Sequence, residues 1–212
     1  MKQTTPFLPL PALLLLSACN GGSDSSSAAS APNVEDLTTG VYTVSTGDAN
    51  APTVGKYYSG FNGDRLLVLN GSNDQATQLY QRQGNNVWES TPTQSATVTL
   101  LRHDAALTAG NIAVSSFAGN YVTQAAQGIN ASFTVSSGGV ISANATDCKI
   151  SGQLSAGSMP DTLKLNLKTV NCGSLPSSSS GYLMADNDYA PAAFRLLTVS
   201  GQQIVDLWSY AD

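Results

Sequence analysis

Residues suited to catalysis are few in this chain of 212 residues. His103 is its only histidine and lies within Arg102-His103-Asp104. A histidine acting as a general base needs a nucleophile and an orienting acid within hydrogen-bond reach. Asp104 is next to it, but adjacent residues of a strand point to opposite faces. No Gly-x-Ser-x-Gly motif marks a nucleophilic serine. The pattern favours an exposed loop histidine, and we expect a protein that is not an enzyme.

Asp186 and Asp188, within Ala185-Asp186-Asn187-Asp188-Tyr189, are the nearest approach to a carboxylate cluster. Glycoside hydrolysis requires two acids that face each other across a cleft. A calcium loop of the EF-hand type needs further spaced ligands and a terminal Glu, and these are missing. The pattern favours a polar turn before Pro191, and we expect neither a metal nor a cofactor.

Aromatic residues form two groups that could bind a ligand. One contains Tyr57, Tyr58 and Phe61, and the other contains Trp208 and Tyr210, which share one face of a strand because they alternate. Stacking on a sugar or a peptide is one interpretation. Core packing is commoner for Tyr and Trp in small β domains, and it is the interpretation we favour.

The composition predicts which elements must position these residues. Apolar residues make up 42% of the chain and charged residues only 11%, against ~25% in an average soluble protein. The remaining polarity comes from residues typical of turns and exposed strand faces. The net charge is −5, with 9 basic and 14 acidic side chains and no basic cluster. Nucleic acid is therefore not an expected partner.

Short β-branched and aromatic runs, separated by Gly, Asn and Ser turns, predict an all-β fold built as an antiparallel β-barrel or β-sandwich. Gly40-Val41-Tyr42 and Gly119-Asn120-Tyr121 each open a series of hairpins, which favours two small β subdomains. We place the first at 34–102, a connection at 103–116 and the second at 117–212. Only 34–39 and 104–110 could hold a helical turn. The strongest strand candidates are 40–44, 54–58, 65–69, 76–82, 131–135, 140–143, 148–154, 163–170, 194–199 and 204–210.

The N-terminus carries the most specific motif. An apolar run from Phe7 follows Lys2 and ends in Leu16-Ser17-Ala18-Cys19, where a signal-peptide cleavage site belongs. About 10 residues are too few to span a bilayer, which needs ~20. The four residues resemble the lipobox of bacterial lipoproteins. The resemblance implies a signal peptide at 1–18, lipid on Cys19, and the outer membrane as destination, because Asn rather than Asp follows the cysteine. Residues 19–33 read as a disordered linker, rich in Gly, Ser and Ala, that spans about 20 Å.

The other two cysteines, Cys148 and Cys172, would then lie in an oxidising compartment. We predict a disulfide between them, with a loop-closure contribution of about 3.5 kcal/mol. Two buried free thiols are the alternative. A zinc site is disfavoured, because two cysteines and one histidine do not supply four ligands. The order of elements in the second segment also resembles uncharacterised β-rich lipoproteins of proteobacteria.

These observations predict a membrane-anchored bacterial lipoprotein with a non-catalytic binding or envelope-structural role. An unidentified protein or glycan is the expected partner besides the membrane. An inhibitor of a cationic enzyme such as lysozyme is the alternative, because a disulfide-stabilised acidic β domain could neutralise one. A hydrolase is the last hypothesis, and it would require His103 to be buried beside a serine and an acid.

Overall fold

The computed structural model of the protein describes residue 1 and residues 30–212. Leu16-Ser17-Ala18-Cys19, the rest of the predicted signal peptide after residue 1, and the predicted linker as far as residue 29 lie outside the described residues. The described part is nearly all β, as the sequence predicts. Its two short 3-10 helices are η1 (Val114–Phe117) and η2 (Asn187–Tyr189). No helix of the described residues has the length and apolarity needed to cross a bilayer.

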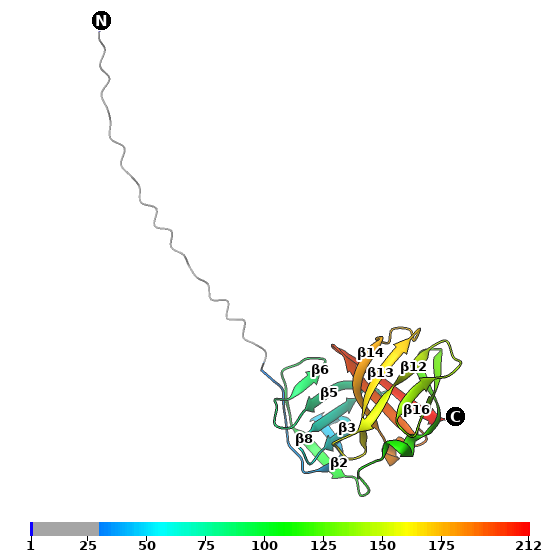
Figure 1. The fold of residues 1–212 in the computed structure, drawn as a ribbon. Coiled ribbons are helices and arrows are strands. Elements are labelled where there is room, and N and C mark those ends of the chain that lie inside the picture. The colour runs from blue at the N-terminus through cyan, green and yellow to red at the C-terminus, as the bar shows by residue number, and fades with distance from the viewer. Residues whose placement is uncertain (2–29) are drawn as a thin grey trace.

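The C-terminal half forms a closed antiparallel barrel of eight strands, each paired with its neighbour in sequence, and the last strand pairs with the first (Figure 1). Side chains alternate between the inside and the outside of the barrel: Leu163, Leu165 and Leu167 point inward, while the residues between them are exposed. The strands are β9 (Gly119–Ala126), β10 (Ile129–Val135), β11 (Val140–Ala143), β12 (Lys149–Ala156), β13 (Thr162–Val170), β14 (Ser178–Met184), β15 (Phe194–Ser200) and β16 (Gln203–Ala211).

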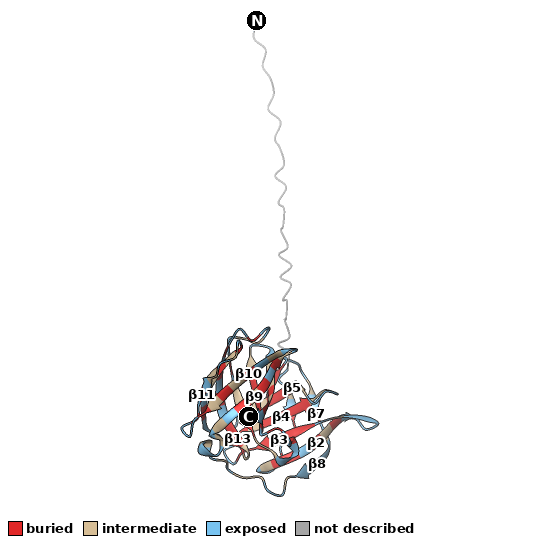
Figure 2. Cartoon of the chain, turned by 90° about the vertical axis from the view of Figure 1, so that its right-hand side faces the viewer, coloured by how far each residue is buried: buried red, intermediate tan, exposed pale blue. Residues whose placement is uncertain are grey.

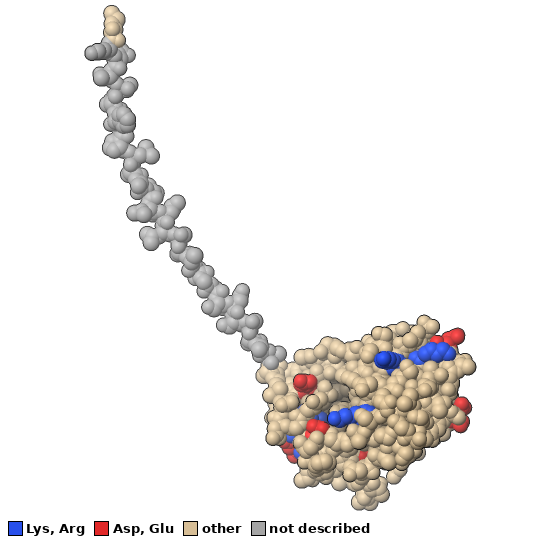
Figure 3. All heavy atoms as spheres, viewed as in Figure 1, with Lys and Arg blue, Asp and Glu red and all other residues tan. Residues whose placement is uncertain are grey.

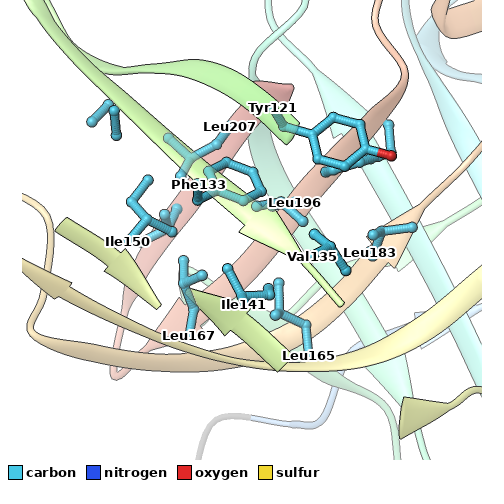
Figure 4. Close-up of a cluster of buried hydrophobic side chains, with 14 of the residues drawn as sticks. Tyr121, Phe133, Val135, Ile141, Ile150, Leu165, Leu167, Leu183, Leu196 and Leu207 are labelled. Carbon is cyan, nitrogen blue, oxygen red and sulfur yellow. The ribbon is translucent and has the colours of Figure 1, made fainter. Parts of the chain in front are cut away.

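Side chains fill the barrel, as is typical of eight strands. Phe133, Ile150 and Phe194 are fully buried at its centre, among leucines from β13 to β16 (Figure 4). The disulfide between Cys148 and Cys172 is present, with a Cα–Cα distance of 4.6 Å. The predicted pairing is therefore confirmed, and both cysteines belong to this core. The bridge joins the residue before β12 to the segment that follows β13.

The N-terminal half forms an open antiparallel sheet of six strands in the order β6-β5-β4-β3-β2-β8. The apolar run from Leu66 to Leu69 lies in a strand that is buried on both faces, as the sequence predicts (Figure 2). Leu66 and Val68 face the barrel, whereas Leu67 and Leu69 face the opposite side, where the core includes Val34 and Leu37. The strands are β2 (Gly40–Asp48), β3 (Ala51–Ser59), β4 (Arg65–Asn70), β5 (Ala76–Arg82), β6 (Glu89–Thr91) and β8 (Leu100–Ala105).

A small parallel pair covers the outer face of this sheet. It joins β1 (Asn33–Val34) to β7 (Thr97–Val98), and Val34 and Val98 pack into the sheet's outer core with Leu37. β1 begins at Asn33, the last residue of the predicted linker. The helical turns considered at 34–39 and 104–110 do not form, because the apolar residues of the first segment pack on the sheet and the second begins in β8.

The predicted boundary at residue 103 falls inside β8, which pairs with β2 as far as Ala105. The link between the halves is therefore shorter than 103–116. The two halves also share a third apolar core, in which Val41 and Tyr58 of the sheet meet Met184 and Leu197 of the barrel. The outer surface of β14 and β15 thus serves as the second cover of the sheet.

Candidate functional site

A cleft of about 950 Å³ lies between the sheet and the barrel. Its walls come from β2 and β3, from the turns between β4 and β5 and between β9 and β10, and from η2 and β16. Residues with amide side chains line it from both halves: Asn70, Asn73 and Gln75 from the sheet, Gln124 and Gln127 from the barrel. Because both halves supply its walls, the cleft depends on how they are held together.

Arg195 is the main link at the base of this cleft, and it is fully buried. Its Nε donates to Asp206 Oδ1 at 2.7 Å and its Nη2 donates to Asp206 Oδ2 at 2.6 Å. The same Nη2 donates to Asn70 Oδ1 at 3.0 Å, and the Ala76 N–H donates to Asp206 Oδ2 at 2.6 Å. This ion pair of the barrel therefore holds both ends of the β4–β5 turn of the sheet.

Trp208 covers this ion pair from the cleft side. The guanidinium of Arg195 lies 4.8 Å from the centre of its ring, and Tyr189 meets the ring edge-on at 5.0 Å. The Gln75 amide, oriented with its oxygen toward the indole, accepts from Nε1 at 2.9 Å. Trp208 thereby contacts Arg195 of the barrel and Gln75 of the sheet.

Lys56 makes the second link, from β3 to η2. Its Nζ lies 2.8 Å from Asp186 Oδ2 and 2.5 Å from Asp188 Oδ2. Burial disfavours the charged amine, but the hydrogen bonds and charges of the two carboxylates prevail and raise the pKa of Lys56. Asp186 also caps η2 by accepting from the Asp188 N–H. The predicted polar turn is present, and its acids bind a lysine that lies far away in sequence.

Two further polar contacts cross the interface. Tyr58 and Tyr189 share a hydrogen bond of 2.7 Å between their hydroxyl groups, and burial raises the pKa of Tyr58 well above its usual value. Asp64, at the turn before β4, accepts from the Ser158 hydroxyl, from Asn62 Nδ2 at 2.9 Å and from the Gly84 N–H at 2.8 Å. Each charged side chain at the interface thus has an ion-pair or hydrogen-bond partner, although Nη1 of Arg195 has no hydrogen-bond partner of its own. These contacts hold the two walls of the cleft together.

The aromatic groups divide between core and cleft. Tyr57 and Tyr58 are fully buried on opposite faces of β3, as the preferred interpretation requires. Phe61 is 79% exposed and contradicts it. Trp208 and Tyr210 both line the cleft, and Tyr210 is 41% exposed. Trp208 and Tyr210 therefore share one face of the last strand, as their alternation predicts, and that face borders the cleft.

His103 does not lie in the cleft. It is exposed as predicted, but it lies in strand β8 rather than in a loop. There it meets the Tyr42 ring edge-on, with a distance of 6.1 Å between ring centres. Asp104 points to the other face and pairs with Arg102 at 2.6 Å. This is not the serine, histidine and acid arrangement that the hydrolase hypothesis requires. Among the described residues, no three His, Cys, Asp or Glu side chains gather as a metal-ion site.

The sequence interpretation missed Lys56, Arg195 and Asp206. A signal for the arginine exists, because Phe194-Arg195-Leu196-Leu197 places one charge in an apolar strand, where a charge needs a buried partner. Nothing local identifies that partner. A comparison with protein-family models, curated proteins and solved structures finds no match to this chain.

Proposed function

We propose that the protein is a membrane-anchored bacterial lipoprotein with a non-catalytic binding role, and that the cleft between the sheet and the barrel receives its ligand. The cleft carries this proposal, because a large, preformed concavity with a few polar groups is typical of ligand sites. It favours binding over a purely structural role in the envelope. The anchor rests on Leu16-Ser17-Ala18-Cys19, whose lipid would hold the protein at the outer membrane.

The lining of the cleft favours a neutral, hydroxyl-rich ligand such as a glycan. Each amide of Gln124 and Gln127 offers a donor and an acceptor together, which suits a pair of neighbouring hydroxyl groups. Tyr210 adds an exposed ring that can stack on the apolar face of a sugar. Two ion pairs at the cleft are buried, Lys56 with Asp186 and Arg195 with Asp206, and the exposed Asp188 also binds Lys56. Because these charges are already paired with each other, they neither require nor favour a charged ligand.

Binding of a panel of neutral oligosaccharides to the purified chain, measured by calorimetry, tests the ligand class. We expect Q127A and Y210A each to weaken the best binder about tenfold or more, since each removes an exposed contact. F61A is the control, because it removes an exposed aromatic ring that does not line the cleft. An unchanged affinity in Y210A would show that the cleft is not the site, and a panel without binders would contradict the glycan class.

The anchor is tested separately by C19S. The variant should appear in the soluble fraction as a folded protein, because the lipidated cysteine is the proposed attachment. Its retention in the membrane would overturn the proposed anchor and leave the cleft unaffected.

Inhibition of a cationic enzyme is a second candidate function, favoured by one observation. The β2–β3 hairpin extends beyond the neighbouring strands β8 and β4, since Ala51 to Val54 pair only with β2. The tip of the hairpin carries the exposed Asp48. Among the described residues, only Asn50 donates hydrogen bonds to this carboxylate. Lysozyme activity should fall with excess protein and recover with D48N; unchanged activity would remove this candidate.

A further inference from the structure

The strand β8 is an open edge of the six-stranded sheet. It pairs with β2 on one side and is the last strand in the sheet order. All its residues except Leu100 are exposed, and Figure 2 shows it at the rim of the sheet. The barrel has no such edge, because it closes on itself. An edge of this length offers unpaired N–H and C=O groups to another strand.

The pairing with β2 identifies which of these groups point outward. The Ala106 N–H donates to the Val41 carbonyl at 2.8 Å, next to the facing residues Tyr42 and Ala105. Hydrogen-bonded and non-bonded pairs alternate along an antiparallel ladder. It follows that the backbone N–H and C=O of Asp104 bond to β2, whereas the backbone N–H and C=O of His103 point away from the sheet.

The side chains of β8 are complementary to those of a second β8 that runs in the opposite direction. If the twofold axis passes beside His103, the two His103 residues lie opposite each other. The outward N–H and C=O of each His103 can then bond to the backbone of the other. Arg102 then faces Asp104 of the second copy, and Asp104 faces its Arg102. Both side chains are largely exposed, at 74% and 55%. These residues stand at non-bonded positions, where side chains on neighbouring strands approach most closely.

We propose that β8 pairs with β8 of a second copy of this chain in antiparallel register centred on His103. The contact is isologous, as in most homodimers, and joins two six-stranded sheets into one continuous sheet. Leu101, which is 47% exposed, then lies opposite Ala105 of the second copy and is covered. The inference does not depend on the ligand of the cleft, which lies outside this edge.

Cysteine cross-linking of the full chain in membranes tests the register. Facing residues of a hydrogen-bonded antiparallel pair have Cα atoms about 5.5 Å apart, a distance that a disulfide bridges. H103C should therefore give an oxidised dimer that reductant reverses. L101C alone should not cross-link, because the cysteine at position 101 of the second copy lies four positions away along the ladder. L101C combined with A105C should cross-link, because these two positions face each other. The chain without added cysteine is the control.

Charge exchange provides the second test, by sedimentation of the full chain in detergent. R102D places Asp opposite Asp104 at two symmetric sites and should raise the dimer dissociation constant about tenfold. D104R should do the same, and the double variant R102D/D104R should restore the original value. A monomer in the unaltered chain, an L101C dimer as abundant as that of H103C, or a double variant as weak as the single ones would each overturn the proposal.

Discussion

The open sheet and the closed barrel begin with the same local structure and end differently. Tyr42 at the start of β2 donates its hydroxyl hydrogen to the Thr38 carbonyl at 3.1 Å. Tyr121 at the start of β9 does the same to the Phe117 carbonyl, also at 3.1 Å. The repeat noticed in the sequence is therefore real in local geometry. Each tyrosine opens a series of hairpins, and only the second series closes into a barrel.

Closure decides how each half is stabilised. The barrel buries the inward side chains of all its strands in one core and leaves no backbone edge. The sheet is apolar on both faces, so it requires two covers: the β1–β7 pair on one side and the outer wall of the barrel on the other. Few charged side chains appear on the surface in Figure 3, where both halves are visible. The sheet therefore depends on the barrel more than the barrel depends on the sheet.

Separating the halves should produce the largest effect. Residues 112–212 should fold alone and unfold cooperatively, because their core is internal, although the uncovered wall of β14 and β15 will favour association. Residues 30–111 should not fold, because one apolar face loses its cover. Near-ultraviolet circular dichroism and urea titration of both pieces provide the measurement. A cooperative transition in residues 30–111 would refute the dependence.

Removal of the Arg195 side chain should loosen the sheet from the barrel. R195A leaves Asp206 buried without its partner, at a cost of about 3–5 kcal/mol in the free energy of unfolding. Hydrogen exchange should accelerate in β4 and β5 before it does in the barrel core. Equal acceleration in both halves would show that the ion pair serves the whole fold rather than the junction.

Loss of the disulfide should act on the other half. C148S/C172S should lower the free energy of unfolding by about 3.5 kcal/mol through the lost constraint on the unfolded chain. Here the increase in hydrogen exchange should begin in β12 and β13, which the bridge connects. Urea titration gives the energy, and an effect first seen in the sheet would contradict the assignment.

Proline substitution should distinguish an edge from a closed ladder. Asn166 and His103 both have exposed side chains in strands, but β13 has a neighbour on each side. N166P removes a bonded N–H and should cost about 3 kcal/mol or more. H103P removes an outward N–H and should cost less than about 1 kcal/mol, while it weakens the proposed dimer. Similar thermal shifts in the two monomers would disprove the outward orientation.

Acidification should have the smallest effect, at the contact between Asp64 and Ser158. Burial alone would raise the pKa of Asp64, but hydrogen bonds from Ser158, Asn62 and the Gly84 N–H prevail and lower it. The stabilisation is therefore present above the usual pKa of aspartate and is lost as pH falls through the lowered value. Urea titrations between pH 7 and pH 3 should show a weaker acid dependence in D64N. An unchanged dependence would assign the acid sensitivity to other carboxylates.

Much of the fold could be predicted because its signals are local. The alternation of Leu163, Leu165 and Leu167 identified a strand with one buried face, and the run from Leu66 to Leu69 identified one buried on both. The site was predicted only in part. Trp208 and Tyr210 were placed on a common face, but Lys56 was not linked to Asp186 and Asp188, because 130 and more residues separate them in the chain.

The all-β class, the strand faces and the cysteine pair follow from the sequence. The hydrophobic period and the turn residues act over short distances along the chain, and so few cysteines leave few possible pairings. The N-terminal motif Leu16-Ser17-Ala18-Cys19 keeps its place as a prediction made from sequence alone. Three features cannot be predicted from such local signals: which series of strands closes, which face of the barrel covers the sheet, and where the cleft lies. These depend on the strand register and on pairs such as Arg195 with Asn70, whose energies arise only when distant segments meet.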